Sequence, residues 1–375
     1  MTVGLGWPDT VEPSDGPLGW PEQQRTTSAP EPVPNEGVVS RETTPEAADD
    51  QMATRTVSLG ATHSVAVEPA VVEAIGKVSV GEGVVSRETP PATVDPDLAP
   101  EVVAALQPGQ PWPRPKQRRV MTIANQKGGV GKTTSAVNLA AALALHGLRV
   151  LVIDLDPQGN ASTAYSLSHK TGTPSIYDVL LGARALAEVA VPIEGIPGLW
   201  CVPATIDLAG AEIELVSMVA RESRLKAALD ALDDDVDYVF IDCPPSLGLL
   251  TLNAMVAASE VLIPIQCEFY ALEGLSQLLN NVQLVRSHLN PKLYVSTILL
   301  TMYDARTRLA DQVAFEVREH FGDLVLDAVI PRSVRVSEAP GFGQPVITFD
   351  SSSRGSRAYL AAAYDLAVRG ERGVV

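Results

Sequence analysis

The sequence predicts an α/β fold, a doubly wound and mostly parallel sheet with helices on both faces, preceded by a long disordered N-terminal tail. Three observations lead to this prediction: the composition changes near residue 119, short apolar runs then alternate with amphipathic stretches, and a glycine-rich loop joins the first run to the first stretch. Buried parallel strands are short apolar runs, and helices usually connect them.

The first 118 residues have the composition of a disordered segment. Residues 1–119 contain 17 of the 29 prolines, with many Glu, Ser and Thr residues. Such a chain cannot bury enough apolar surface to offset the entropy lost on ordering. We therefore expect a disordered Pro/Glu-rich tail at 1–118, with a helical turn around Val71–Lys77 as an open alternative. The basic, proline-rich stretch Pro111–Arg119 is interpreted as a hinge into a single folded domain at 119–375.

Two short duplications mark the tail. Leu5–Pro8 recurs as Leu18–Pro21, and Glu36–Thr43 recurs unchanged as Glu82–Thr89. They are either drift in an unconstrained linker or short linear motifs. Three of the four tryptophans also lie there, as candidate anchors for a polar or scaffold partner: Trp7, Trp20 and Trp112.

Charge and composition limit the classes of function. With a formal net charge of −17, the chain does not bind nucleic acid constitutively through bulk charge, so DNA binding would need a local basic patch. No signal-peptide pattern and no run of ~18 apolar residues is present, which predicts a soluble, cytoplasmic protein without stable membrane insertion. Cys201, Cys243 and Cys267 are too few and too scattered for a disulfide framework or a metal site, and are expected to be small buried residues.

From residue 120 onward, strands and helices are expected to alternate. The expected strands are Val120–Ala124, Val150–Ile153, Leu199–Val202, Tyr238–Ile241, Val261–Ile265, Tyr294–Leu300 and Val325–Ile330. The expected helices are Thr133–His146, closed by Gly147, and Ala209–Leu232, Leu250–Ala258, Leu272–Leu289 and Gln312–Phe321. Ligands of such sheets bind beyond the carboxyl ends of the strands, which is where the polar motifs fall.

The strongest motif is Asn125–Thr134, which follows the first strand and opens the first helix. This is the context of a phosphate-binding loop, in which backbone N–H groups and the helix N-terminus surround a phosphate. Gln126 replaces an expected glycine, and Lys127 adds a second lysine. Lys132 is expected to reach the β- and γ-phosphates and Thr133 to ligate Mg²⁺. The predicted nucleotide-binding residues of this loop are Lys127, Gly128, Gly129, Val130, Gly131, Lys132, Thr133 and Thr134.

Two acidic motifs follow later strands. Asp154 and Asp156 end the second strand and begin the loop after it, where they can serve Mg²⁺ and the attacking water. Asp242 closes the apolar run Tyr238–Ile241, which is the arrangement of a Walker-B aspartate. The predicted metal ligands are therefore Thr133, Asp154 and Asp242.

In these motifs the chain resembles the ParA/Soj partition ATPases, within the MinD/ParA group of deviant Walker-A proteins. The resemblance runs from about Val120 to Leu366. The matching segments are Asn125–Thr134, Asp154–Asn160, Asp242–Leu247, Glu268–Gly274, Leu300–Arg306, Pro331–Pro340 and Ser353–Gly355.

The resemblance implies an ATP-dependent mechanism with Mg²⁺ as cofactor. It implies a nucleotide-sandwich homodimer in which Lys127 crosses to the partner's phosphates, with Lys127, Lys132 and Asp156 catalytic. It also implies that Asp156 orients or activates the water and that Pro331 and Arg332 lie near the adenine. Hydrolysis would be slow alone and stimulated by a ParB-like centromere-binding partner.

The resemblance further implies nonspecific, ATP-dependent DNA binding and an association with the nucleoid. Arg306, in an Asp-Ala-Arg motif, is the first candidate contact. Gln283 replaces an arginine frequent in relatives, and Arg286, three residues later, is a candidate substitute. Arg354 and Arg357 are further candidates, either for DNA contact or for surface ion pairs.

Other functions stay open at this point. A membrane-positioning ATPase like MinD would need a basic amphipathic C-terminal helix, whereas Tyr359–Arg369 is rich in alanine. An iron–sulfur reductase would need cysteines such as Cys243 and Cys267 to hold a bridging cluster. A ParA-like ATPase that positions another cargo is hardly distinguishable from one that partitions chromosomes or plasmids. The tail shows no paired helices for operator binding.

Overall fold

The computed structural model describes residues 104–107, 109–232, 235–268 and 271–373, without the side chains of 271–273. The repeats, the helical turn around Val71–Lys77 and the disorder expected for most of the tail lie outside the described residues.

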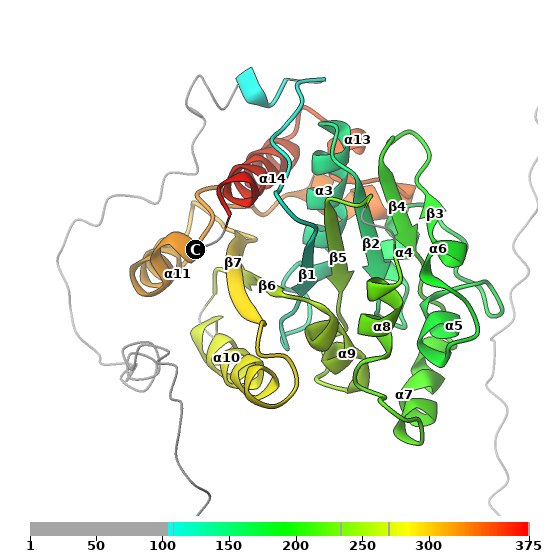
Figure 1. The fold of residues 1–375 in the computed structure, drawn as a ribbon. Coiled ribbons are helices and arrows are strands. Elements are labelled where there is room, and N and C mark those ends of the chain that lie inside the picture. Colours follow the sequence, from blue (N-terminus) through cyan, green and yellow to red (C-terminus); the bar gives the residue numbers. More distant parts are fainter. Residues whose placement is uncertain (1–103, 108, 233–234, 269–270, 374–375) are drawn as a thin grey trace, which may run out of the picture. The chain divides into compact units, whose positions relative to one another are not determined.

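The described residues build a seven-stranded sheet in the order β3-β4-β2-β5-β1-β6-β7 (Figure 1). All neighbouring strands are parallel except the β3–β4 pair at one edge. The strands are β1 (Arg119–Ile123), β2 (Val150–Asp154), β3 (Val191–Pro192), β4 (Leu199–Val202), β5 (Tyr238–Asp242), β6 (Glu260–Gln266) and β7 (Tyr294–Thr301). The predicted α/β class with a mostly parallel sheet is confirmed.

Both faces of the sheet are buried, which explains the uninterrupted apolar runs. Along β2, Leu151 and Ile153 belong to one hydrophobic cluster while Val150 and Val152 belong to the other. Successive side chains of a strand point to opposite faces, so each apolar run supplies two cores at once.

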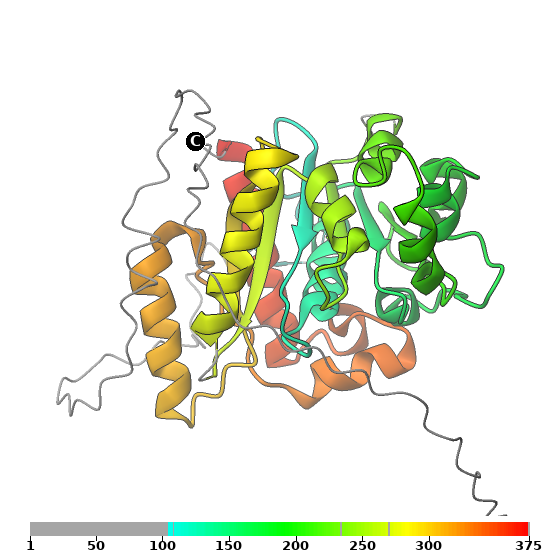
Figure 2. The ribbon, with the colours of Figure 1, turned by 90° about the horizontal axis from the view of Figure 1, so that it is seen from below.

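Helices cover both faces (Figures 1 and 2). One face carries α3 (Lys132–Leu145), α4 (Asn160–Ala164), α13 (Val346–Phe349) and α14 (Arg354–Arg372). The helices whose side chains join the hydrophobic cluster on the other face are α5 (Ile176–Leu181), α6 (Leu186–Val189), α7 (Leu208–Val216), α8 (Arg224–Asp230), α9 (Leu249–Ala257), α10 (Ala271–His288) and α11 (Arg308–Phe321). Within the described part of the chain, no helix has the length and apolar character needed to cross a bilayer.

Two predicted elements are wrong. The expected strand Val325–Ile330 makes only an isolated bridge from Val325 to Ile298, although its chain runs beside β7. The expected helix Ala209–Leu232 is two helices, α7 and α8. The turn between them contains Ala220 at φ +54°, a left-handed conformation that no helix continues through.

The expected hinge before the domain is folded onto it. The Trp112 ring is buried and stacks on His146, with the ring centroids 3.9 Å apart, and its edge faces Tyr364 at 5.4 Å. Its Nε1 donates to the Ala105 carbonyl at 2.8 Å. Trp112 therefore packs as a core residue of the α/β domain rather than as a free anchor in the tail.

Candidate nucleotide-binding site

Three adjacent strands bring the sequence motifs together. In the sheet β5 lies between β1 and β2, with Asp242 paired in register with Ile123 on one side and with Asp154 on the other. Because the strands are parallel, the loop after β1 and both carboxylates emerge at the same edge. The predicted phosphate loop, Asp154 and Asp242 thus form one site.

The phosphate loop is shaped by glycines and tied to neighbouring strands. Gly131 adopts φ +88°, a left-handed conformation that disfavours other residues, immediately before α3. Thr301 Oγ1 donates to the Val130 carbonyl at 2.9 Å, and Asn125 Nδ2 donates to the Pro264 carbonyl at 2.8 Å. The loop is therefore held from β7 and β6, and the N–H groups from Gly128 to Thr134 lie at the helix N-terminus, where they can bind an anion.

The two lysines of the loop have different surroundings. Lys132 is buried, and its Nζ donates to the Lys127 carbonyl at 3.3 Å. Burial lowers the pKa of Lys132, and the nearby Asp242 carboxylate opposes that shift. Lys127 is more exposed and forms an ion pair with Glu268, which follows β6. A bound phosphate would be a strong anionic partner for Lys132 and would stabilise its buried ammonium group.

Asp242 is the least satisfied side chain of the site. It is fully buried, and neither carboxylate oxygen receives a hydrogen bond from any residue that the structure describes. Burial, reinforced by the Asp154 carboxylate, raises its pKa well above the ordinary value. The Thr133 hydroxyl lowers the pKa in part, although the pair does not meet hydrogen-bond geometry. Two unpaired buried oxygens beside a hydroxyl fit a hard cation, because Mg²⁺ takes oxygen ligands and usually needs only one or two carboxylates plus phosphates.

Asp154 is engaged differently. Its Oδ2 accepts hydrogen bonds from Ser162 N at 2.8 Å and Ser162 Oγ at 2.7 Å, and its Oδ1 accepts one from Asp156 N at 3.3 Å. Burial raises its pKa to about 6 despite these bonds. Its oxygens are therefore already used within the protein, unlike those of Asp242, and its role as a metal ligand stays a prediction.

Asp156 lies in the loop between β2 and α4 and is 8% exposed. Its Oδ1 accepts a hydrogen bond from Gln158 N at 3.0 Å. Gly159 follows at φ +64°, where a Cβ would come within 2.9 Å of the His169 ring. The loop thus keeps a compact form that only glycine allows, with the carboxylate beside the phosphate loop and able to act on a water molecule.

A pocket of about 420 Å³ adjoins the phosphate loop. It is lined by Gly131 and Thr134 on one side and by Pro331 and Arg332 on the other, so two distant predicted segments meet there. The sequence predictions missed its other lining residues, which include Thr301, Met302, Ser333, Val336 and Tyr359. The signal that could have found Met302 is the segment Leu300–Arg306, which carries the family resemblance. In the structure its φ is +50°, a strained conformation of the kind found at binding sites.

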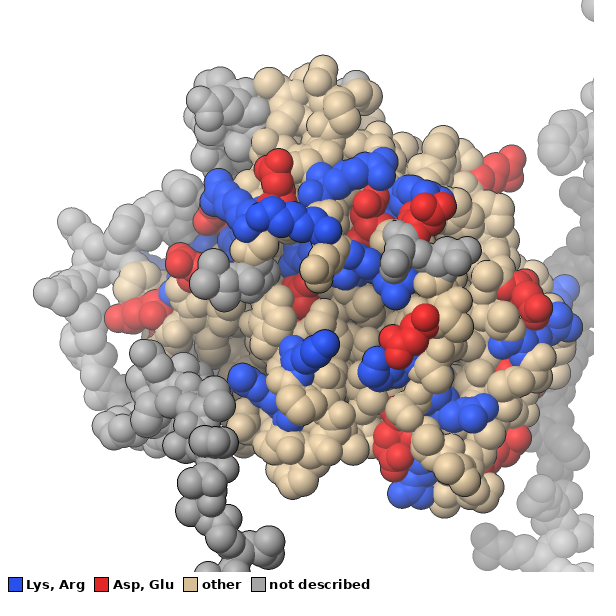
Figure 3. All heavy atoms as spheres, in the orientation of Figure 1, with Lys and Arg blue, Asp and Glu red and all other residues tan. Residues whose placement is uncertain are grey.

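The four candidate DNA-contacting arginines come from three separate elements. Arg306 is 86% exposed and forms a two-point ion pair with Asp304, at 2.8 and 2.7 Å, which holds the pKa of Asp304 down at about 2. Arg354 and Arg357 are exposed at the start of α14, and Arg286 is half-buried near the end of α10. On the face in Figure 3, basic side chains gather in the upper part but have acidic side chains among them.

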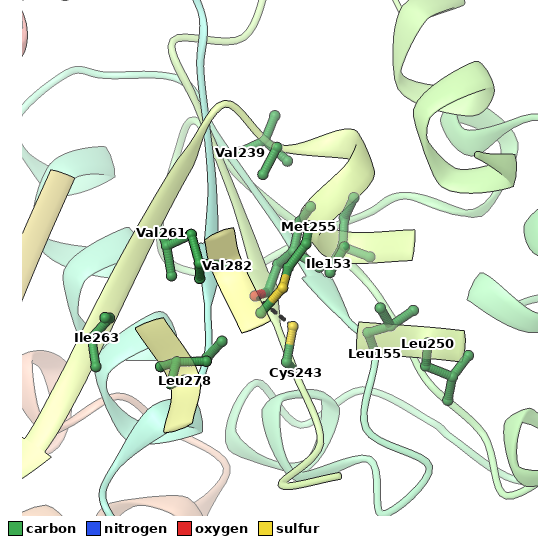
Figure 4. Close-up of a cluster of buried hydrophobic side chains, with 14 of the residues drawn as sticks. Ile153, Leu155, Val239, Cys243, Leu250, Met255, Val261, Ile263, Leu278 and Val282 are labelled. Atoms are coloured by element: carbon green, nitrogen blue, oxygen red, sulfur yellow. Dashed lines mark hydrogen bonds between the residues drawn. The ribbon is translucent and has the colours of Figure 1, made fainter. Parts of the chain in front are cut away.

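The cysteines are core residues, as expected. Cys243 lies among Leu155, Leu250 and Met255 in the cluster of Figure 4, and Thr122 Oγ1 lies 3.0 Å from its Sγ. Burial raises the pKa of both Cys243 and Cys267 to about 12. Both thiols are therefore neutral in this structure.

Known proteins match the part of the chain that contains this site. A family model described as an AAA domain matches residues 118–295. The chain is 54% identical over 253 residues to the chromosome partitioning protein ParA of Caulobacter vibrioides, covering 67% of this chain and 94% of that protein. It is 52% identical over 252 residues to the sporulation initiation inhibitor protein Soj of Bacillus subtilis, covering 67% of this chain and 99% of that protein.

Solved structures match the same region. Cobyrinic acid a,c-diamide synthase of Mycobacterium smegmatis, with a bound ATP analogue and magnesium, is 40% identical with a TM-score of 0.58, covering 67% of this chain and 95% of that one. MinD of Pyrococcus horikoshii, complexed with Mg-ADP, has a TM-score of 0.55 and covers 66% of this chain and 95% of that one. At 24% identity it supports the fold only. With half of its aligned residues identical to nearly whole ParA and Soj chains, this protein belongs to the ParA/Soj family of chromosome-partitioning ATPases.

Proposed function

We propose that the ATP-bound form of this ATPase is a homodimer that binds DNA nonspecifically, and that hydrolysis stimulated by a ParB-like protein releases it. The observation that carries the catalytic part is the meeting of the phosphate loop with the unpaired Asp242 carboxylate at one edge of the sheet. Segregation of chromosomes or plasmids would follow from repeated binding and release on the nucleoid, in the cytoplasm.

The binding step assigns each loop residue a role. Lys132 and the N–H groups from Gly128 to Thr134 hold the phosphates, and the pocket beside Pro331 and Arg332 receives the nucleoside. Thr133 and Asp242, with Asp154 behind them, would hold Mg²⁺. When bound, that ion neutralises charge developing on the β- and γ-phosphate oxygens.

The hydrolytic step needs a water and a second positive charge. Asp156 orients the water and accepts its proton, as its position at the loop edge allows. Lys127 of one subunit reaches the phosphates of the other, in the role that an arginine finger has elsewhere. Hydrolysis is therefore completed only in the dimer.

The DNA-binding step must differ between the nucleotide states. A patch equally present in both states produces no directed release. A dimer can bring Arg286, Arg306, Arg354 and Arg357 of two subunits onto one surface, where they would contact DNA phosphates. The chain's overall negative charge favours a basic ParB-like activator.

The test is binding of the full chain to nonspecific duplex DNA at fixed moderate salt, with ATP and Mg²⁺ or with ADP. We expect binding with ATP only, and loss of that binding in the double variant Arg286→Glu/Arg306→Glu while ATP-dependent dimers persist. Intact DNA binding by the double variant would rule out this patch. ATP-dependent dimers that bind no DNA would instead identify a ParA-like ATPase that positions its cargo on another surface.

A further inference from the structure

Lys127, the residue proposed to act in the partner subunit, is bound to its own subunit in this structure. Its Nζ forms an ion pair with Glu268 Oε1, and the two side chains are 34% and 39% exposed. The roles proposed for the phosphate loop and for Asp242 do not require an acidic residue at position 268.

The backbone holds both partners of this ion pair in place. The β6 strand lies beside β1, so the segment after β6 runs along the start of the phosphate loop. Asn125 links the two, because its Nδ2 donates to the Pro264 carbonyl at 2.8 Å and its Oδ1 accepts from Lys127 N at 3.0 Å. On the other side, Cys267 N donates to the Thr301 carbonyl at 3.2 Å and Glu268 N to the Gln266 carbonyl at 2.8 Å. The fold therefore holds the backbones of Lys127 and Glu268 within reach of an ion pair.

We infer that Glu268 is a positioning residue that retains Lys127 in its own subunit and thereby opposes assembly of the ATP dimer. The inference rests on the proposed crossing of Lys127. An ammonium that moves to the partner's phosphates leaves Glu268, so the free energy of the ion pair is subtracted from that of dimer formation. A triphosphate carries more negative charge than one carboxylate. The exchange of Glu268 for the partner's phosphates as the ligand of Lys127 is therefore favourable only when ATP is present.

The expected size follows from the exposure of the pair. Ion pairs that are a third or more exposed are weak, so removing this one shifts an equilibrium only about two- to five-fold. Such an effect is regulatory in scale: it sets the concentration at which dimers form and leaves dimer formation dependent on ATP.

The test measures the dimer dissociation constant of the full chain by analytical ultracentrifugation, with a non-hydrolysable ATP analogue and Mg²⁺. Glu268→Gln keeps the size of the side chain and removes its charge. Because each dimer breaks two such pairs, we expect a dissociation constant about four- to twenty-five-fold lower. Glu268→Asp keeps the charge and should stay close to the unmodified protein. Asp230→Asn is the control, because Asp230 forms a more exposed ion pair with Lys226 at 2.7 Å on α8. This helix lies just before β5, so the pair is at the amino ends of the strands, away from the phosphate loop.

Lys127→Gln separates the two levels of the hypothesis. If it abolishes ATP-dependent dimers while Glu268→Gln strengthens them, both the crossing and the retention by Glu268 hold. If it abolishes them while Glu268→Gln leaves the dissociation constant unchanged or raises it, the inference about Glu268 is wrong and the proposed function stands. If Lys127→Gln dimerises normally, the crossing itself is wrong.

Discussion

Replacing Asp242 with Asn should stabilise the nucleotide-free protein while destroying its activity. The wild-type carboxyl is fully buried without a hydrogen bond, and its pKa is raised well above the ordinary value of 3.8. The native state therefore either holds a buried charge or takes up a proton that the unfolded chain does not bind at neutral pH. Asn keeps nearly the same volume and polarity, so the substitution removes mainly the charge and the proton uptake.

The magnitude has an upper limit set by the pH. At pH 7 the unfolded Asp lies about 3.2 units above its pKa, so keeping the native group neutral costs at most about 4 kcal/mol. At pH 5 the same limit is about 1.6 kcal/mol.

The sign follows from the raised pKa. A carboxyl whose folded-state pKa is raised contributes its full stability below the unfolded pKa, and that contribution is lost as the pH rises through the folded pKa. The advantage of Asp242→Asn should therefore grow from pH 5 to pH 7. Each kcal/mol corresponds to about 2–4 °C in melting temperature for a domain of this size.

The assay is thermal unfolding followed by circular dichroism, in EDTA and without nucleotide, at both pH values. Glu319→Gln serves as the control, because Glu319 is exposed on α11. A melting temperature for Asp242→Asn that is unchanged or lower at pH 7, or an advantage that grows toward pH 5, would refute the reasoning.

Three other substitutions test different parts of the molecule. Trp112→Ala should lower the free energy of unfolding by about 2–4 kcal/mol in a denaturant titration, since it removes a buried ring stacked on His146. Replacing the exposed Lys116 with Ala should change the free energy of unfolding by less than about 0.5 kcal/mol. Equal effects of the two substitutions would contradict the docking of this segment. Lys132→Ala should abolish binding of a fluorescent ATP analogue, and retained affinity would contradict its role. Asp156→Ala should keep ATP binding but trap the DNA-bound dimer, so rapid turnover by this variant in a phosphate-release assay would exclude Asp156 as the residue that acts on the water.

The parallel sheet and the phosphate loop were predictable because the residues of each segment indicate its structure without reference to distant parts of the chain. Each apolar run is a strand buried on both faces, and Gly131 stands where the backbone must turn left-handed before α3. The helix α5 was missed although it has a local signal: Ser175 and Asp178 form a capping box at its start, and Gly182 ends it.

Other features depend on contacts between distant segments. Val325–Ile330 is as apolar as a strand but pairs with β7 only through scattered hydrogen bonds, and no local pattern distinguishes the two cases. Trp112 lies in a proline-rich stretch with the composition of a linker, and its place in the core depends on the distant rings of His146 and Tyr364. The pairing of Lys127 with Glu268 joins residues 141 positions apart in the chain.

The docking of Trp112 also determines where attached groups can be placed. Trp112 packs at the C-terminal end of α3, whereas the phosphate loop lies at the N-terminal end of the same helix. The helix has 14 residues and is therefore about 21 Å long. A fluorescent reporter or affinity tag joined directly before residue 104 is thus attached at the end of the domain remote from the phosphate loop. Immobilisation through that attachment should leave the phosphate loop open to partners in solution.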